Sequence, residues 1–342
     1  MHRADAAPST GTDDERITAE NRAWVCSTPL RGLVAHFGGT WPDGDLSEVL
    51  GYLDDFSARH WDFRDGRERP DAREPDLDPA TEKLVLDAAA ALGLIQPVPP
   101  ARPAYAHLVV LGGLAHACVR RLGYAAHLLR TGLPVSGEVA VLGSFRPLSD
   151  WERRTLADAG LPADETEVDV LDTAVRRVFG VAAPTEQAGV DAGHPHHSWS
   201  SRTYRPDGLP PIRVLAAPSS EPDQRRAHTA DTQRFWAGHV RLAPGDEVLM
   251  VTAPIYVPFQ HCDALRTLAL PYGCAIDTVG VDPTLADLAV LPEQTLTPGR
   301  YLQEIRSAIR SMRALHAGLH PAVSATAWAK TSERCSKLRN RP

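Results

Sequence analysis

The spacing of apolar residues divides the chain into a helical first part and a longer second part of alternating strands and helices. Over residues 45–61, apolar side chains recur every three or four positions, which places them on one face of a helix. These side chains are Leu46, Val49, Leu50, Leu53 and Phe56. A second helix is predicted further on, because Asp78 and Pro79 are typical of a helix start and Gly93 of a helix end. We therefore expect a helical N-terminal segment over residues 17–95.

Three polar or proline-rich stretches mark the limits of the two parts. Residues 1–16 are polar and carry Pro, Gly and Asp, so we expect a disordered arm there. Residues 96–106, QPVPPARPAYA, form a Pro-rich linker and are the clearest internal boundary. Residues 318–342 are basic and have little apolar patterning, so we expect them to be a tail.

After the linker, short apolar runs alternate with amphipathic helical stretches. The apolar runs cover residues 107–113, 137–144, 211–220, 246–254 and 274–282. Helices between successive strands favour parallel pairing with right-handed crossovers. The strands are apolar on both faces, as buried parallel strands are. We therefore expect an α/β domain over residues 107–317, built on a mainly parallel, five-stranded sheet.

Composition narrows the class of protein. The chain has 342 residues, 43% hydrophobic content and a formal net charge of -7, which argues against a general nucleic-acid-binding protein. No window approaches 18 uninterrupted apolar residues, so we expect no membrane-spanning helix and no membrane partner. The first residues, MHRADAAPSTGTDDERITAEN, contain no apolar run typical of a secretory signal. A cytoplasmic location is the resulting expectation.

Polar and flexible residues follow several of the predicted strands. The carboxyl ends of parallel strands lie at one edge of a sheet, where ligands bind in open α/β folds. The residues that we expect to meet a ligand there are Gly112, Gly113, Gly143, Ser144, Arg146, Thr229, Thr232, Thr252, Tyr256 and Gln260. On the helix after the first strand, Arg120 or Arg121 can neutralise an anion, and Arg121 is the one that we select. Taken singly, such residues are explained as helix caps and turns, but as a set they predict an anion-binding crevice.

Several familiar motifs are missing from these turns. The first turn reads LGGLAHA instead of G-x-G-x-x-G, and the second strand ends in Gly-Ser instead of an acidic residue. The usual recognition of the NAD ribose is therefore unsupported, and the same missing acid argues against the ordinary pose of an adenosyl methyl donor. The sequence also contains neither G-x-x-x-x-G-K-[ST] nor G-x-S-x-G, which argues against a P-loop and a nucleophile elbow.

Two further groups of residues are candidates for chemistry. Glu167 can act as a general acid or base at the crevice, or it can simply complement the positive end of a helix dipole. His194, His196 and His197, in GHPHHSWSS, can hold a transition metal, or they can form a solvated loop. No H-E-x-x-H motif accompanies them, so we predict no metal and keep the metal site as an alternative.

Residues 107–282 resemble the YdcF/SanA/ElyC-like domain family. That family has a strand ending in LGG with an arginine on the next helix, then a Glu-containing helix start, a Thr/Asn-rich helix start, and a strand reading vllVTs before a Tyr/His-bearing turn. This chain has VVLGG, VAVLGS, TEV with Glu167, HTADT and VLMVTAPIY in the same order. It departs from the pattern at Tyr256 and Gln260, where the family has His and Arg, and in an insertion over residues 181–211.

The resemblance implies a Rossmann-like three-layer fold, and it makes S-adenosylmethionine a candidate cofactor, because one member is thought to bind it. Some members are linked to carrier-lipid metabolism of the cell envelope, a role that transfers poorly to a chain without a membrane anchor. The N-terminal helices lie outside the resemblance, and we expect them to pack over the crevice as a lid or side domain.

The sequence thus predicts a cytoplasmic enzyme, a transferase or hydrolase, that binds a nucleotide-like, adenosyl or phosphorylated small molecule. Glu167 is the candidate acid or base, and the residues at the strand ends bind the ligand. Two alternatives stay open. One is a non-catalytic module that binds S-adenosylmethionine or a nucleotide, and the other is a metal-dependent hydrolase that uses His194, His196 and His197.

Overall fold

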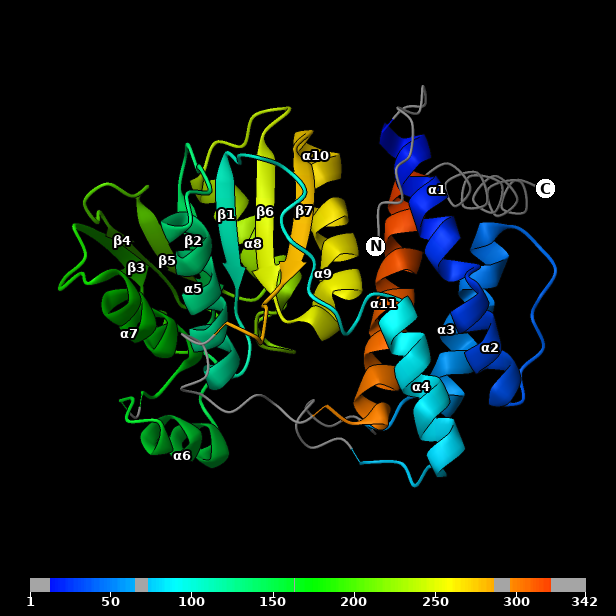
Figure 1. Ribbon diagram of the computed structural model, residues 1–342. Coiled ribbons are helices and arrows are strands. Elements are labelled where there is room, and N and C mark those ends of the chain that lie inside the picture. The colour runs from blue at the N-terminus through cyan, green and yellow to red at the C-terminus, as the bar shows by residue number, and fades with distance from the viewer. Residues whose placement is uncertain (1–12, 65–72, 163, 286–295, 321–342) are drawn as a thin grey trace, which may run out of the picture.

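The protein is a mixed α/β structure in which helices cover a mostly parallel, seven-stranded sheet (Figure 1). The computed structural model describes residues 13–64, 73–162, 164–285 and 296–320. Within these ranges, no helix is both long and apolar enough to cross a membrane.

The strands are ordered β3-β4-β5-β2-β1-β6-β7 across the sheet. Their bounds are β1 (His107–Leu111), β2 (Val139–Gly143), β3 (Glu186–Val190), β4 (Trp199–Tyr204), β5 (Ile212–Ala216), β6 (Glu247–Thr252) and β7 (Ala275–Gly280). The five strands from β5 to β7 in this order pair in parallel. All residues of β1 and β2 are buried, which agrees with apolar side chains on both faces. The prediction of a mainly parallel sheet is confirmed.

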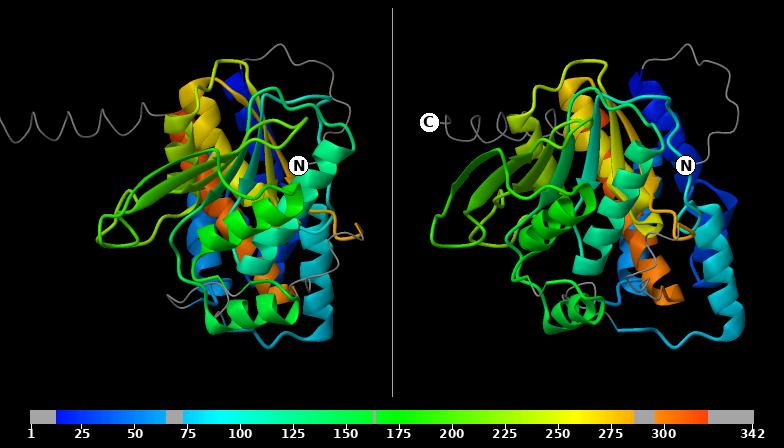
Figure 2. Two further views of the ribbon diagram at one scale, coloured as in Figure 1. Left: turned by 90° about the vertical axis from the view of Figure 1, so that its left-hand side faces the viewer. Right: turned by 60° about the vertical axis from the view of Figure 1, so that its left-hand side comes forward.

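The sheet has two more strands than the five that we expected. β3 and β4 form an antiparallel hairpin inside the insertion at residues 181–211, and β4 also pairs antiparallel with β5. Figure 2 shows this hairpin at the far edge of the sheet, away from the N-terminal helices. Every residue of β3 is exposed, so its sequence, EQAGV, lacks the apolar alternation that identifies a half-buried strand.

Helices lie on both faces of the parallel strands. Their bounds are α5 (Ala115–Arg130), α6 (Asp150–Asp158), α7 (Glu167–Phe179), α8 (Thr229–His239), α9 (Val257–Ala264) and α10 (Leu270–Tyr272). α5 and α7 pack on one face of the sheet, in a core that includes Leu122, Val141 and Leu171. α8 and the segment from α9 into the π-helical turn η3 (Leu265–Ala269) pack on the other face, where Trp236 and Leu268 are buried.

The N-terminal helices form a separate layer on the β7 side of the sheet (Figure 1). They are α1 (Asp13–Val25), α2 (Thr28–His36), α3 (Leu46–His60) and α4 (Pro79–Ala91). At the predicted start of α4, the Asp78 side chain accepts hydrogen bonds from two backbone N–H groups of the first turn, and at the start of α3 Asp45 makes a capping box with Glu48. The apolar faces of these helices meet in one buried cluster that includes Leu50 and Val85.

The last helix, α11 (Pro298–Leu319), completes this layer instead of the α/β part to which we assigned residues up to 317. Its Leu302, Ile305 and Ile309 are buried against α3 and α4, and α11 also packs on α9. The helical layer therefore combines the two ends of the described chain. A hydrogen bond from Asn21 Nδ2 to the Met312 carbonyl (3.1 Å) joins α1 to α11 directly.

Both predicted end boundaries need correction by a few residues. The arm expected over residues 1–16 overlaps α1, which begins at Asp13 and packs on the helical layer through Ile17 and Trp24. The tail expected from residue 318 overlaps α11, which continues to Leu319. The rest of the predicted arm and tail, residues 1–12 and 321–342, lies outside the described residues.

Candidate functional site

The strand order brings most of the predicted ligand-binding residues to one edge of the sheet. β1 lies between β2 and β6, so the turns after Leu111, Gly143 and Thr252 are neighbours. The helix after β1 packs on one face of the sheet and the helix after β6 on the other. In open α/β sheets, such a change of side creates a crevice at the carboxyl ends of the two strands.

The turn after β1 is built around Arg121. This side chain is 1% exposed, and its Nη1 donates to the carbonyl oxygen atoms of Leu111 (2.7 Å) and Gly112. A Cβ atom at Gly113 would lie 3.1 Å from the same nitrogen, so the guanidinium packs directly on the turn. Of the two arginines that the sequence offered, Arg121 is the one that enters the interior. Arg120 is only half-buried.

Glu167 lies at the start of α7 and reaches the ends of β1 and β2. Its Oε2 accepts hydrogen bonds from the Ser144 backbone N–H (3.1 Å) and hydroxyl (2.8 Å). Its Oε1 lies against Gly112, where an added Cβ would come within 2.6 Å of it. A Cβ at Gly143 would meet Leu171 at 2.6 Å, so α7 packs closely on the second turn too. The carboxylate is therefore held in a fixed position, 7% exposed, beside the first turn.

A carboxylate already occupies the helix N-terminus that we expected a ligand anion to use. Glu152 Oε1 accepts a hydrogen bond from the backbone N–H of Ala115, the first residue of α5 (2.9 Å). Arg146 donates to both oxygen atoms of Glu152 (2.9 and 2.8 Å) and to the Gly113 carbonyl oxygen (2.8 Å). The positive end of the α5 dipole and the charge of Arg146 are thus balanced within the protein.

The pKa of Glu152 reflects this pairing. Burial alone would raise it, but the hydrogen bonds from Arg146 and its positive charge outweigh burial and lower the pKa to about 2. In the sequence, Glu152 follows Ser149 by three positions, the spacing of a capping box, and the structure contains this box. Its contact with Ala115, 37 positions away, has no local signal in the sequence.

Of the three predicted residues in the segment after β6, Tyr256 is the one that lies against Arg121. The Tyr256 ring centroid is 5.8 Å from the Arg121 Cζ atom, which fits a cation–π contact. The Thr252 hydroxyl donates to Gln260 Oε1, and both side chains are at most 3% exposed. Thr252 and Gln260 therefore bond to each other and fix this turn, while Tyr256 faces the first turn.

The predicted residues on α8 bond within their own helix and loop. The Thr232 hydroxyl donates to the Thr229 carbonyl oxygen (2.9 Å), as in an ordinary helix turn. Beside them, Asp231 Oδ2 accepts from Arg225 (2.5 Å) and lies 3.2 Å from His228 Nδ1. Burial would raise the pKa of Asp231, but the Arg225 hydrogen bond and others lower it to about 2. This ion pair is the polar centre of the turn after β5.

His116 is a further buried group at this edge. It is 2% exposed, its ring makes an edge contact with Trp151 (5.3 Å between centroids), and its Nδ1 has no hydrogen-bond partner among the described residues. Burial and, second, the positive charge of Arg121 lower the pKa of His116 to about 4, so the ring is neutral at pH 7. The sequence around it, LAHACVRR, gives no indication that His116 is buried at this edge.

The loop that carries His194, His196 and His197 is held by contacts within the protein. His194 packs edge-on against His196, with 4.7 Å between ring centroids, and His196 Nδ1 lies 3.1 Å from the Pro222 carbonyl oxygen. His197 Nε2 is 3.4 Å from Asp223 Oδ1. Within the described residues, no three His, Cys, Asp or Glu side chains are grouped so that they can hold a metal ion.

Comparisons with known proteins identify relatives over nearly the whole chain. A family model described as the Rv3785 N-terminal domain matches residues 8–93. The uncharacterized protein Rv3785 of Mycobacterium tuberculosis strain H37Rv is 33% identical over 343 residues, which cover 92% of this chain and 94% of that protein. The uncharacterized protein Mb3814 of Mycobacterium bovis matches to the same extent. No solved structure is significantly similar to the chain. The chain belongs to the family of the mycobacterial protein Rv3785.

Proposed function

We propose that the chain is an enzyme that binds an anionic small molecule between the ends of β1 and β6. The ligand is a nucleotide-like, adenosyl or phosphorylated metabolite, and the reaction is a transfer or a hydrolysis. In this proposal the α/β part is a Rossmann-like domain, which the order of the five parallel strands supports. The resemblance to the YdcF/SanA/ElyC-like family, and with it S-adenosylmethionine as the cofactor, stays a prediction.

One observation carries the proposal: Arg121 and Glu167 reach the same two-glycine turn from different helices. Arg121 bonds to the Gly112 carbonyl oxygen, and Glu167 Oε1 lies against the same glycine. Both charged groups are less than one-tenth exposed, a costly arrangement that stability alone does not require. A positive charge and a carboxylate held beside one turn are suited to binding an anion and moving a proton next to it.

The roles of the other residues follow from their contacts. Because Glu152 neutralises Arg146, we propose that Arg121 balances the negative charge of the ligand. Arg146 then fixes the first turn through its bond to the Gly113 carbonyl oxygen. The Ser144 hydroxyl orients the Glu167 carboxylate, and Tyr256 provides an aromatic surface beside Arg121. Gly112 and Gly113 allow this close packing, since a Cβ at either would meet charged side-chain atoms within about 3 Å.

A non-catalytic binding module is the second candidate. The observation in its favour is that Ser144, at the end of β2, engages Glu167 through both its backbone and its hydroxyl group. A carboxylate used in this way can serve to connect α7 to β2 without taking part in a reaction. The same crevice would then bind the ligand through Arg121 alone.

The first experiment identifies the ligand class. Mass spectrometry of small molecules that co-purify with the full chain comes first, followed by thermal-shift screening of nucleotides, adenosyl compounds and sugar phosphates. A ligand that binds only the folded state raises the melting temperature as its concentration increases. We expect one anionic class to stabilise the wild type and to lose this effect in Arg121→Gln. Stabilisation by none of these classes would contradict the proposal.

The Glu167→Gln variant then separates the two candidates. For an enzyme, we expect turnover to fall at least about 100-fold, because general acid–base catalysis contributes roughly that much, while ligand affinity changes little. Glu165→Gln is the matched control, since Glu165 lies two residues earlier and is exposed. Equal turnover in Glu167→Gln and the control would remove Glu167 from the reaction. Ligand binding without any turnover in the wild type would favour the binding module.

A further inference from the structure

A cavity lies at the opposite edge of the sheet, where the parallel strands begin. It has a volume of about 700 Å³ and opens to solvent. Its walls come from the segments before β1, β2, β5 and β6, and the lining residues are Ala104, Tyr105, Ala106, Leu129, Gly132, Leu133, Pro134, Val135, Ser136, Gly208, Leu209, Pro210, Gly245, Asp246 and Glu247. This volume is within the range of small-molecule sites.

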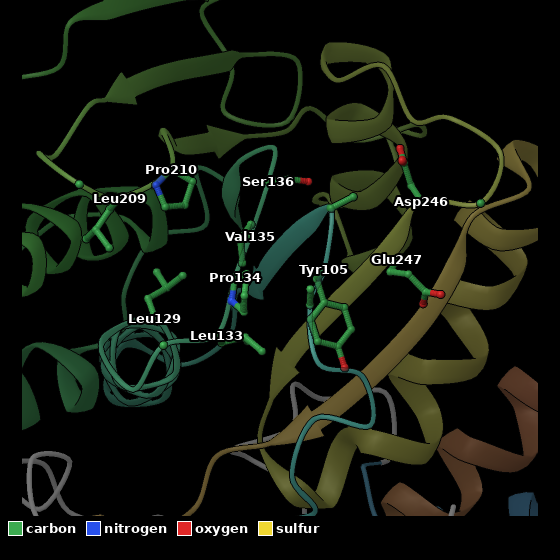
Figure 3. A pocket seen from close by; sticks show the side chains of 15 residues that line it. Tyr105, Leu129, Leu133, Pro134, Val135, Ser136, Leu209, Pro210, Asp246 and Glu247 are labelled. Carbon is green, nitrogen blue, oxygen red and sulfur yellow. The ribbon is translucent and has the colours of Figure 1, made fainter.

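The lining is divided into an apolar wall and an acidic wall (Figure 3). The apolar wall consists of Leu129, Leu133, Pro134, Val135, Leu209 and Pro210. Asp246 and Glu247 lie across the cavity from it, and the ring of Tyr105 lies between the two walls. The Tyr105 hydroxyl donates to Asp277, which fixes the ring at the base of the cavity. A ligand that fits both walls has an apolar body and a polar group at one end.

The charge at the acidic wall is negative. None of the lining residues is basic. Asp246 accepts a hydrogen bond from the Ala243 backbone N–H (2.7 Å), and its Oδ2 lies 3.9 Å from His107 Nε2. Burial lowers the pKa of His107, so this ring is neutral at pH 7 and does not offset the charge of Asp246.

Glu247 forms an exposed ion pair with Arg102, which another cation can replace. Its carboxylate is 3.1 Å from Arg102 Nε, but the Arg102 side chain is 43% exposed and the Glu247 side chain 30%. An exposed ion pair of this kind is weak and exchanges readily with solvent or another cation. The cavity lining therefore presents two carboxylates, and the exposed Arg102 outside the lining pairs with one of them, which leaves a net negative charge beside an apolar surface.

We propose that this cavity binds a small organic cation with an apolar body, such as an alkylammonium compound. The ammonium group lies at the acidic wall formed by Asp246 and Glu247, and the alkyl chain packs on Leu133, Pro134 and Leu209. This site is separate from the one proposed at the carboxyl edge, and neither depends on the other.

Hexylammonium is the probe that tests the proposal, and hexanoate and hexanol are its matched controls. Titration of the isotope-labelled full chain, followed by NMR, is expected to shift the amide signals of Gly132, Gly208 and Gly245 in a saturable manner. Hexanoate is expected to cause no such shift, because it brings a negative charge to the acidic wall, and hexanol to bind more weakly than hexylammonium. Saturation equal for all three probes, or shifts confined to other parts of the protein, would overturn the proposal.

Two variants distinguish a built site from general attraction to a negatively charged protein. Asp246→Asn combined with Glu247→Gln is expected to weaken hexylammonium binding at least about fivefold, since each partly exposed charge pair contributes modestly. Asp158→Asn removes an exposed carboxylate from α6, at the other edge, and is expected to leave the affinity unchanged. Equal affinities in the double variant and the control would show that the two acids do not form the site.

Discussion

The two edges of the parallel sheet use charged residues in opposite ways. At the carboxyl edge, Arg121, Glu152 and Glu167 are 1%, 1% and 7% exposed, and they bond to backbone groups and to the side chains of Arg146 and Ser144. At the amino edge, the Arg102–Glu247 pair is 43% and 30% exposed. Burying charge is costly unless each group is well paired, so the carboxyl edge is rigid and specific. The amino edge keeps its charges hydrated and accessible.

The largest expected effect tests how tightly the carboxyl edge is packed. Gly112→Ala would place a Cβ 2.6 Å from the Leu142 carbonyl oxygen and from Glu167 Oε1, so either the backbone or α7 must shift. We expect the free energy of unfolding to fall by about 3 kcal/mol, the upper range for overpacking. The measurement is equilibrium denaturation with urea.

Gly238→Ala is the control for this substitution. Gly238 lies within α8 and has no neighbouring atom within 4 Å of an added Cβ, so alanine is expected to raise the free energy of unfolding by about 0.5 to 1 kcal/mol. If Gly112→Ala is as stable as this control, the turn after β1 is looser than the contacts around it indicate.

The second prediction compares one arginine from each edge. Arg121→Met removes hydrogen bonds from a charged group to two backbone carbonyl oxygens inside the protein, and we expect a loss of about 3 kcal/mol in the free energy of unfolding. Arg102→Met breaks only an exposed ion pair, so the loss is expected to stay below about 1 kcal/mol. Equal losses in parallel urea titrations would contradict the difference between the edges.

The third and smallest effect concerns pH. The pKa of Glu152 is about 2 in the folded protein, below its usual 4.5, so Glu152 adds stability above pH 4.5 that is lost as the pH falls towards 2. The difference in unfolding free energy between wild type and Glu152→Gln is therefore expected to shrink in that window. At the amino edge, burial lowers the pKa of His107 from 6.5, so the folded protein binds this proton less readily than the unfolded chain. Stability is therefore lost as the pH falls below about 6.5, a window that begins at a higher pH than that of Glu152.

Urea denaturation of wild type, Glu152→Gln and His107→Gln between pH 7 and 3 separates the two windows. The difference for His107→Gln is expected to change first as the pH falls, and the difference for Glu152→Gln later. If both differences change over the same pH range, the two edges do not differ in the way that their burial suggests.

The parallel core was readable from the sequence because it depends on local pattern. Buried strands such as HLVVL and VLMVT are apolar runs, and the order of runs and helices implies parallel pairing. The β3–β4 hairpin was not predicted, because β3 is fully exposed and its sequence therefore shows no hydrophobic alternation. The position of α11 was also missed, because its apolar stripe fits either the sheet or the N-terminal helices.

The sequence predicted that the candidate site lies at the strand ends, but it did not predict which side chains pair with each other there. The sequence left Arg120 and Arg121 as alternatives on the same helix, and the burial of Arg121 between Cys118 and Ala125 becomes clear only in the structure. The pairing of Glu152 with Arg146 and Ala115 depends on how α6 folds back on α5. Such a contact between distant segments follows from the fold and leaves no periodic pattern.

The joining of α11 to the N-terminal helices has a consequence for how the protein folds on the ribosome. The segment over Asp13–Ala91 leaves the exit tunnel first, but the surface that covers its Leu50 and Val85 includes α11, which is synthesised more than two hundred residues later. Domains generally fold as units during synthesis, the N-terminal one first. Here the apolar face of the N-terminal helices stays without its α11 partner until Pro298–Leu319 has been synthesised, so this layer cannot complete its core before the α/β part has been made.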